Sequence, residues 1–403
     1  MNENNINLNK IINNLLNDKL DVNQIISESL IQTLLSHILN SLMTKERDLF
    51  IQNNPSSVKN GFYQRKDFSI GSIPIPLSIP RTRDSIFFPS ILPKYSRTLP
   101  DMYKNLISSL ILSSQSINSL KLTLSSLNLP FNSKQIDQIV NELAEEYRAI
   151  NTRELQPDWL FIFADAKVIE IRNEQKETKK AVILTAIGIN MAGEKHYLGS
   201  IIRYGNENLE AWKELFENLA VRGVRRVLMV ITDNFSGIEK VIKGYYPLAM
   251  TQFCLVHLIR NARYRLSKEE WKIFREKIEM IEKVNRYEEA DRLMEEIIEM
   301  VEKKHRSFAK EIRKDKERYI AFVKFPKEIR SRIKSNNASE NFHKEIEKIR
   351  INSGGYFQSE RILEAKVCIM IKRIEYGRWR KGEPLIKGYL YELHRMFKEV
   401  YGE

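Results

Sequence analysis

The chain has 403 residues, 42% of them hydrophobic, which is enough to bury the cores of two or three domains. Its 65 lysine and arginine residues outnumber 52 acidic residues, and the net charge of +13 favours a polyanionic partner, first of all nucleic acid, unless it merely reflects a lysine-rich proteome. The chain has only two cysteines, which argues against a disulfide-rich protein. It has no apolar run near the roughly 20 residues that a membrane helix needs, and no signal-peptide pattern at its N-terminus. We therefore expect a cytoplasmic protein.

The first 100 residues divide into two segments of different character. Residues 1–54 begin with an asparagine-rich stretch and continue with an apolar spacing over 19–46 that predicts an amphipathic helix, for packing or dimerisation. Residues 55–100 contain seven prolines, which exclude long helices and favour short strands and extended loops. Over 55–135, ten basic residues against three aspartates leave a local charge of +7, about half of the whole excess.

Residues 101–150 predict three short helices, with Asp101, Ser116 and Ser133 as their N-caps. Short helices joined by tight turns are compatible with a DNA-binding domain of the helix-turn-helix kind. A plain three-helix packing module fits the same pattern nearly as well.

From Trp159 onwards the pattern changes to strands. Three apolar runs over 159–171, 179–190 and 195–204 are joined by short turns and predict an antiparallel meander. Two helices then alternate with two strands, over about 208–222, 226–232, 236–245 and 250–256. The order β-β-β-α-β-α-β matches an α/β core of the ribonuclease-H-like kind, a mixed five-stranded sheet flanked by helices.

We assign this core to residues 155–257 and 336–386. The intervening residues 258–335 are densely charged, have no strand pattern and predict an all-helical insertion, with capping boxes at Ser267–Glu270 and Asn285–Glu288. A C-terminal helix is expected over 387–403.

Three carboxylates stand where a protein core has poor reasons to keep them. Asp165 interrupts one apolar run, Asp233 ends another, and Glu340 opens a helix-like segment far downstream. A lone buried carboxylate costs several kcal/mol unless a cation or strong donors compensate it. In the expected sheet the first strand is central and the fourth lies beside it, so Asp165 and Asp233 would face each other across roughly 5 Å, and a crossing helix could bring Glu340 to the same point. Hard oxygen ligands suit Mg²⁺ or Mn²⁺, and two such ions roughly 3.5–4 Å apart form a phosphoryl-transfer site.

Each acid also has a purely structural interpretation. Asp165 could end a misplaced strand, although apolar residues flank it on both sides. Asp233 precedes Asn234 and could cap a helix or make a turn. Glu340 follows Asn337 by three residues and could form a capping box with it.

Cys254 and His257 resemble half of a zinc site, which needs about four ligands. Cys368 is the second thiol, and no matching pair is formed by the other histidines, at positions 37, 196, 305, 343 and 394. We therefore expect a buried cysteine and a histidine just beyond a strand, beside the active centre.

Taken in order, these residues resemble the Mutator-type transposases of bacterial and archaeal insertion sequences. The resemblance runs from about Asn60 to the end of the chain and rests on short motifs: Asn60-Gly-Phe-Tyr, Pro80-Arg-Thr-Arg-Asp, Ile91-Leu-Pro-Lys-Tyr, the strand around Asp165, Asn208-Leu-Glu-Ala-Trp212, Asp233-Asn-Phe-Ser-Gly237, Cys254-Leu-Val-His257 with Arg260-Asn261, and Asn337-Ala-Ser-Glu340. Any one motif is weak, whereas their shared order and spacing are specific.

The resemblance implies a DDE transposase in which Asp165, Asp233 and Glu340 bind two Mg²⁺ or Mn²⁺ ions, at spacings of 233 − 165 = 68 and 340 − 233 = 107 residues. It implies cleavage of a DNA strand at a terminal inverted repeat by activated water, then attack of the freed 3′-hydroxyl on target DNA. Cys254 and His257 match the family's C-x-x-H motif, and with Arg260 and Asn337 they would lie near the site or the bound DNA. Trp212 matches a family tryptophan that we expect to pack.

Double-stranded DNA, as terminal repeat and as target, is the expected partner, and pairing of two element ends favours a homodimer associated with the nucleoid. Phosphate contacts should dominate its affinity, which would then fall steeply with salt. Candidates for these contacts are, in the proline-rich segment, Arg65, Lys66, Arg81, Arg83, Lys94 and Arg97, and, near the C-terminus, Lys372, Arg373, Arg378 and Arg380. The C-terminal group fits a solvated helix end equally well.

Two other functions stay open. A metal-dependent nuclease or resolvase on the same fold would share the acids but needs no end-recognition module, so the basic segment 55–135 favours the transposase. A non-catalytic DNA-binding derivative would be expected to lose one acid, and all three are present.

Overall fold

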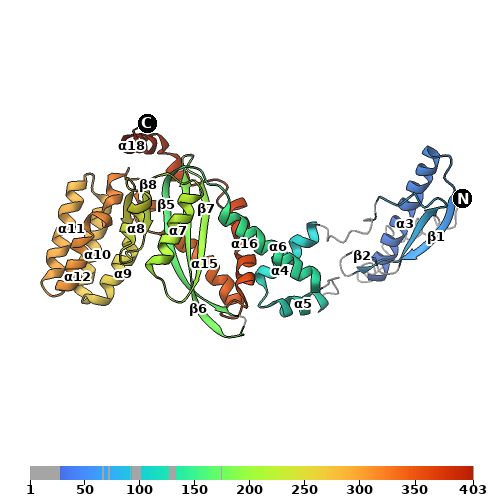
Figure 1. Ribbon diagram of the computed structural model, residues 1–403, viewed down its shortest axis with the longest axis horizontal. Coiled ribbons are helices and arrows are strands. Elements are labelled where there is room, and N and C mark those ends of the chain that lie inside the picture. The colour runs from blue at the N-terminus through green and yellow to red at the C-terminus, as the bar shows by residue number, and fades with distance from the viewer. Residues whose placement is uncertain are drawn as a thin grey trace, which may run out of the picture. The chain divides into compact units, whose positions relative to one another are not determined.

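The computed structural model describes residues 28–65, 68–70, 73–90, 92, 101–126, 133–173 and 175–402, and Figure 1 labels its elements. These residues form two compact units. The first comprises the described residues up to 106 together with 118–135, and the second comprises 107–117 and those from 136 onwards.

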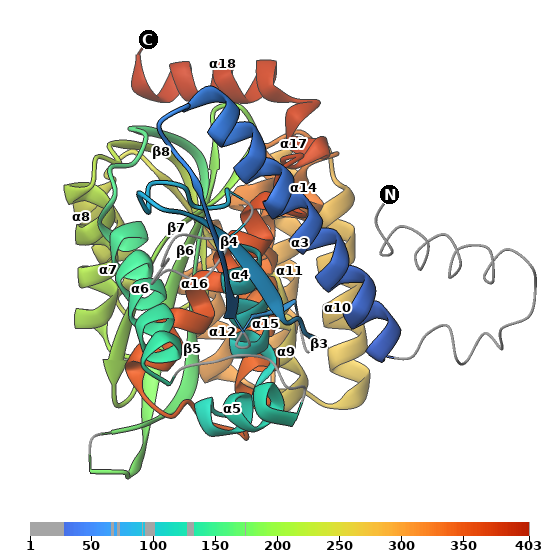
Figure 2. The same ribbon diagram turned by 90° about the vertical axis from the view of Figure 1, so that its right-hand side faces the viewer.

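The first unit is a long helix packed on short strands. Helix α3 (Glu28–Asn53) lies beside β4 (Leu77–Thr82), which pairs with β1 (Lys59–Arg65), while β2 (Ser69–Ile70) pairs with β3 (Ile73–Pro74) (Figure 2). Its core consists of Met43, Ile75, Leu77, Ile79 and Leu92. The expected helix followed by short strands is therefore present, with the helix ending later than predicted. The asparagine-rich residues 1–18 lie outside the described residues.

The three predicted helices of residues 101–150 are confirmed as α4 (Asp101–Ser113), α5 (Ile117–Ser126) and α6 (Ser133–Thr152). They do not stay together as one module, because α5 belongs to the first unit while the end of α4 and most of α6 belong to the second. Their role in DNA binding stays a prediction.

A mixed five-stranded sheet forms the centre of the second unit. Its order is β7-β6-β5-β8-β9, from β5 (Asp158–Arg172), β6 (Thr178–Asn190), β7 (Lys195–Tyr204), β8 (Arg226–Thr232) and β9 (Met250–Phe253). The first three strands are antiparallel, and β8 and β9 run parallel to β5. The predicted strands are confirmed to within a residue, except that β9 ends three residues early because a helix begins at Leu255.

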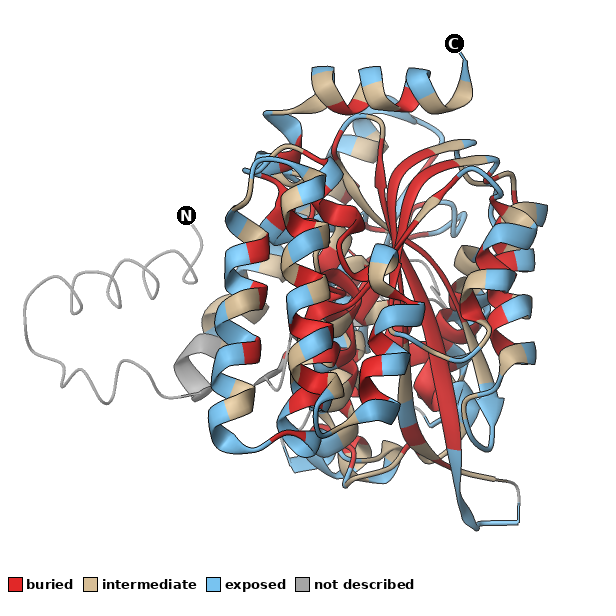
Figure 3. Ribbon diagram, turned by 90° about the vertical axis from the view of Figure 1, so that its left-hand side faces the viewer, coloured by how far each residue is buried: buried red, intermediate tan, exposed pale blue. Residues whose placement is uncertain are grey.

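Helices cover both faces of this sheet. Helices α7 (Leu209–Val221) and α8 (Ile238–Tyr245) lie on one face, and α15 (Asn337–Asn352) and α16 (Glu360–Tyr376) on the other (Figures 2 and 3). The strands are buried between them, as the near-continuous apolar runs require.

Residues 258–335 are helical, as predicted. They comprise most of α9 (Leu255–Arg265), then α10 (Lys268–Lys283), α11 (Tyr287–Glu302), α12 (Arg306–Lys314), α13 (Lys316–Tyr319), a 3₁₀ turn (Ala321–Lys324) and α14 (Arg330–Ile333). The capping box of Ser267 and Glu270 is present. The predicted box at Asn285 is wrong, because α11 starts one residue later than expected and Arg286 becomes its N-cap without a side-chain bond.

The C-terminal residues form α17 (Pro384–Lys387) and α18 (Leu390–Tyr401), so the expected helix is confirmed with a start at Leu390. The Tyr401 hydroxyl accepts a bond from the Val227 N–H at 3.0 Å and donates to the Val227 carbonyl at 2.8 Å. It thereby occupies the edge of β8 that the short strand β9 leaves uncovered. Within the described part of the chain, no helix combines the length and apolar character needed to cross a membrane.

Candidate active site

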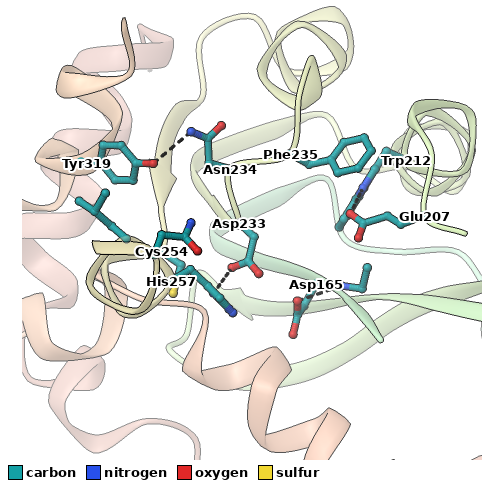
Figure 4. Close-up of a pocket in the computed structure, with 12 residues that line it drawn as sticks. Asp165, Glu207, Trp212, Asp233, Asn234, Phe235, Cys254, His257 and Tyr319 are labelled. Atoms are coloured by element: carbon teal, nitrogen blue, oxygen red, sulfur yellow. Dashed lines mark hydrogen bonds and ion pairs between the residues drawn. The ribbon is translucent and has the colours of Figure 1, made fainter. Parts of the chain in front are cut away.

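The sheet places Asp165 and Asp233 on neighbouring parallel strands. The register of β5 and β8 ends with Ala164 opposite Thr232, and the two aspartates are the next residue on each side. Both line a cavity of about 210 Å³, and Figure 4 shows their carboxylates directed into the same space. Strand β5 continues to Arg172, so Asp165 does not end a strand.

Helix α15 is attached to three consecutive residues of β5. The Asn336 side-chain amide donates to the Ala164 carbonyl at 2.7 Å, and the Ser339 hydroxyl donates to the Phe163 carbonyl at 2.8 Å. One turn further on, Nδ1 of His343 lies 2.9 Å from Oδ2 of Asp165. The start of the helix, which carries Glu340, is thereby fixed against the strand that carries the first acid.

Glu340 converges on the same point through His257. Nδ1 of His257 lies 2.6 Å from Oδ1 of Asp233 and 3.9 Å from Oε1 of Glu340. Asn336 occupies the N-cap position of α15 and makes no capping bond with its side chain, so the capping-box interpretation of Glu340 is wrong. Asn337, which we expected near the site or the bound DNA, is the exposed first residue of the helix, so its contact with DNA stays a prediction, and its neighbour Asn336 is buried.

Asp233 also lacks a capping role. The N-cap of α8 is Gly237, whose φ of 85° lies in the left-handed region that glycine tolerates. The Asp233 carbonyl accepts a bond from the Phe235 N–H, so its backbone makes the turn while its side chain faces His257.

At this site several acidic side chains lie close together beside the charged side chain of His257. Burial raises the pKa of Asp233, the His257 side chain opposes this, and the Asp165 charge raises it further. The Asp233 carboxylate, with a smaller contribution from Cys254, raises the pKa of His257 to about 10, so this imidazole is charged at neutral pH. Arg260, on the same helix as His257, lowers the pKa of Asp233.

The residues present fit a divalent cation. Oδ1 of Asp233, Nδ1 of His257 and Oε1 of Glu340 are buried atoms without an aligned hydrogen bond, although the first two are in ion-pair contact. The two carboxylate oxygens among them are acceptors, and a buried acceptor without a partner costs about 1–3 kcal/mol, which a cation would compensate. His257 can act as a ligand only after it loses its proton. The side chains of Asp233, Cys254 and His257 also offer ligand atoms within 4.8 Å of one another. Among the described residues this cluster has three donors, one fewer than a structural zinc site needs.

Cys254 has a further structural contact. It is the buried N-cap of α9, and its sulfur accepts a bond from the Asn336 N–H at 3.4 Å. It lies just beyond β9 beside the cavity, as expected, and joins the starts of α9 and α15.

Glu207 lines the cavity as its third carboxylate, beside Asp165 and Asp233, and was missed by sequence reasoning. Its Oε1 accepts a bond from the indole N–H of Trp212 at 2.8 Å. Burial raises the pKa of Glu207, and the charges of Asp233 and Asp165 add to this. Trp212 is buried in the core as expected, and it also orients this acid (Figure 4).

The helical insertion contacts the loop that follows Asp233. The Asn234 side-chain amide donates to Asp315 at 2.8 Å and to the Tyr319 hydroxyl at 3.0 Å. Tyr319 also lines the cavity. These partners are 81 and 85 residues away from Asn234 in the chain, and no motif in the sequence indicated the contact.

Of the six candidate DNA contacts in the proline-rich segment, three lie on the β1–β4 ribbon or just after it. Arg81 is exposed and stacks over the Tyr63 ring at 5.9 Å, Arg65 stacks over Phe68 at 5.9 Å, and Arg83 is exposed. The other three, Lys66, Lys94 and Arg97, lie outside the described residues.

The C-terminal candidates differ in their surroundings. Lys372 forms an ion pair with Glu146 of α6 at 2.6 Å, and Arg378 lies 3.4 Å from Glu345. Arg373 and Arg380 are exposed. Lys372 therefore joins α16 to α6, whereas the other three remain at the surface.

Comparison with known proteins identifies the chain. The family model described as "Transposase, Mutator family" matches residues 6–380. The transposase for insertion sequence element IS905 of Lactococcus lactis is 26% identical over 367 residues, covering 89% of this chain and 91% of that protein. The transposase for IS1201 of Lactobacillus helveticus is 25% identical over 345 residues, covering 83% and 92%. Among solved structures, the Drosophila P element transposase strand transfer complex aligns over 77% of this chain and 84% of that one at 9% identity, and its TM-score of 0.28 is too low to support a conclusion. The chain belongs to the Mutator family of transposases.

Proposed function

We propose that the chain is the DDE transposase of an insertion sequence, which cuts DNA at terminal inverted repeats and joins the 3′-hydroxyl ends to target DNA. Asp165, Asp233 and Glu340 would be its catalytic acids on a ribonuclease-H-like core. One observation carries this proposal: Asp233 and Glu340, 107 residues apart in the chain, meet at His257, and Asp165 lies beside Asp233 on the neighbouring strand and lines the same cavity. The strand order, with β5 in the centre and β8 parallel beside it, supports it further.

The same three residues would hold two Mg²⁺ or Mn²⁺ ions, which when bound activate the attacking hydroxyl and offset charge on the scissile phosphate. Each oxygen of Asp165 accepts one bond in the protein, from the Ala166 N–H at 2.9 Å and from His343 at 2.9 Å. A carboxylate has about four lone-pair sites, so both oxygens retain the capacity to bind a cation.

The remaining residues of the site would orient and neutralise. The charged His257 stands between Asp233 and Glu340 and reduces their mutual repulsion before DNA arrives. Arg260 adds a second positive charge on the same helix, in a position to attract a DNA phosphate. Glu207 and Tyr319 close the cavity on its other sides.

The first unit would contact DNA through the β1–β4 ribbon. Almost every residue of β1 is exposed, including the aromatic side chains of Phe62 and Tyr63, and Arg81 and Arg83 add charge beside them. A two-stranded ribbon fits the major groove, and cations on it would supply phosphate contacts. Two chains bound to paired element ends would make the active form a homodimer.

The test is strand transfer of labelled end-repeat DNA in the presence of Mg²⁺. Asp165→Asn, Asp233→Asn and Glu340→Gln should each reduce cleavage and joining to background. The control, Glu299→Gln, removes an exposed acid of α11 and should leave both steps intact.

Three results would redirect the proposal. Activity in any of the three amide variants would remove that acid from the triad. Cleavage of arbitrary DNA without joining would favour the nuclease. Specific binding of the repeat without cleavage in any divalent metal would favour the non-catalytic derivative.

A further inference from the structure

A buried histidine connects the candidate acid of β5 to the neighbouring strand. His343 is 4% exposed, and its Nδ1 lies 2.9 Å from Oδ2 of Asp165 while its Nε2 lies 3.1 Å from the Thr185 hydroxyl. Thr185 is fully buried and stands directly opposite Asp165 in the β5–β6 register. The imidazole therefore bridges a cross-strand pair.

The chemistry of the partners defines the direction of the bonds. A carboxylate can only accept, so the proton of the ring lies on Nδ1 and is donated to Asp165. In the neutral ring Nε2 then accepts from the Thr185 hydroxyl. Rotation of the ring about its Cβ–Cγ bond would break both contacts inside a buried site, so the two partners hold it in one orientation.

His343 also stands one turn after Glu340 on α15. Residues three apart on a helix lie on neighbouring parts of one face. The helix thus presents Glu340 toward His257 and Asp233 while it presents His343 toward Asp165. A shift of α15 along the sheet would displace both contacts together.

We infer that His343 is a positioning residue of the cation site: its N–H bond fixes the carboxylate of Asp165, and its place on α15 couples that carboxylate to Glu340. The inference rests on the proposed function, in which both acids hold divalent ions. Hydrogen bonds that orient a metal-binding side chain are typically worth 10–100-fold in metal affinity or activity. An apolar side chain would fill the same space without orienting the acid, so packing alone does not account for a polar ring between two polar partners.

The experiment compares three substitutions of one residue. In His343→Asn the amide nitrogen replaces Nδ1 and keeps the bond to Asp165. In His343→Gln the amide group reaches the position of Nε2, keeps the contact with Thr185 and loses Asp165. His343→Leu keeps the volume and loses both bonds. Mn²⁺ affinity of the full chain is measured by electron paramagnetic resonance of the free ion, together with the Mn²⁺ concentration for half-maximal strand cleavage and the unfolding temperature.

We expect His343→Gln and His343→Leu to weaken Mn²⁺ binding by about 10–100-fold and to raise the half-maximal concentration in parallel. His343→Asn should stay within a few-fold of the unchanged protein. Equal weakening in the Asn and Gln variants, or unchanged binding in both, would overturn the inference. Should the Leu variant fail to fold, the comparison of Asn with Gln decides the matter.

Asp165→Asn separates this inference from the proposed function. If it binds Mn²⁺ and cleaves DNA as the unchanged protein does, Asp165 is no cation ligand and both proposals fall. If it loses both properties while His343→Gln retains them, the positioning role alone is refuted.

Discussion

Lys366 supplies a test of how the second unit is held together. This lysine of α16 is 2% exposed, and its Nζ donates to the Ser114 carbonyl and to the Ser353 hydroxyl, each at 2.7 Å. It thereby connects the chain after α4, the end of α15 and the helix that packs beside them. Burial lowers the pKa of Lys366 from 10.5 to about 8.

The free energy of unfolding depends on pH because the folded chain releases the Lys366 proton at a lower pH than the unfolded chain does. Between pH 8 and 10.5 the unfolded chain keeps a proton that the folded chain has lost, so this group makes the protein more stable as the pH rises through that window. Below pH 8 the cost of burying the charge is constant. At about 1.4 kcal/mol per pH unit, the free energy of unfolding should gain about 2.5 kcal/mol from this group between pH 7 and 10.

The assay is urea unfolding followed by tryptophan fluorescence, at intervals from about pH 7 to pH 10, across which the folded chain loses this proton. The four tryptophans all lie in the second unit, at positions 159, 212, 271 and 379, so the fluorescence reports the unit that contains Lys366. The free energy of unfolding of the unchanged protein, minus that of Lys366→Met, should rise by about 2–3 kcal/mol across this range. The same difference for Lys344→Met, an exposed lysine of α15, should stay flat. A difference for Lys366→Met that does not vary with pH would refute the reasoning, since it would mean that the buried amine is hydrated or keeps its proton.

Three further outcomes are expected. Asn336→Ala should lower the free energy of unfolding by about 1–3 kcal/mol, because it leaves a buried β5 carbonyl unpaired, and it should also weaken strand cleavage. Urea unfolding and cleavage assays measure the two effects. Asn341 is exposed on the same helix, so Asn341→Ala should change neither. Tyr319→Phe removes one of two partners of Asn234 and should slow cleavage several-fold at unchanged affinity for DNA; equal rates in single-turnover assays would contradict this. Mg²⁺ should raise the unfolding temperature of the unchanged protein by mass action, and Asp165→Asn should lose much of that rise in scanning fluorimetry; an undiminished rise would exclude Asp165 as a ligand.

The strands and their neighbours could be predicted because the sheet is covered on both faces. Long apolar runs with short turns define where each strand begins and ends, and the order of elements makes the first strand central. From that order alone, Asp165 and Asp233 had to end up side by side.

Contacts between distant segments could not be predicted in the same way. The family motif pointed to Asn337, whereas the fold shows that its neighbour Asn336 bonds to β5. His343, 178 residues from Asp165 in the chain, showed no partner in the sequence, because only the packing of α15 against β5 brings the two side chains together. Glu207 was missed for a related reason, since only the fold brings the start of α7 to the cavity.

The chain segments at the two ends of the helical insertion, residues 258–335, are bonded to each other, and this explains how so many residues can separate Glu340 from Asp233. The Leu255 N–H donates to the Lys334 carbonyl at 3.1 Å, and the Asn336 N–H donates to the sulfur of Cys254. The insertion therefore leaves and re-enters the core at one place, directly beside Asp165 and Asp233. Because doubling the length of a closed loop costs only about 0.6 kcal/mol in chain entropy, the number of residues inside it has little influence on the position of Glu340. The spacing of 107 residues thus reports the size of the insertion, while the position of the acid depends on the few contacts at its base and on the bonds from α15 to β5.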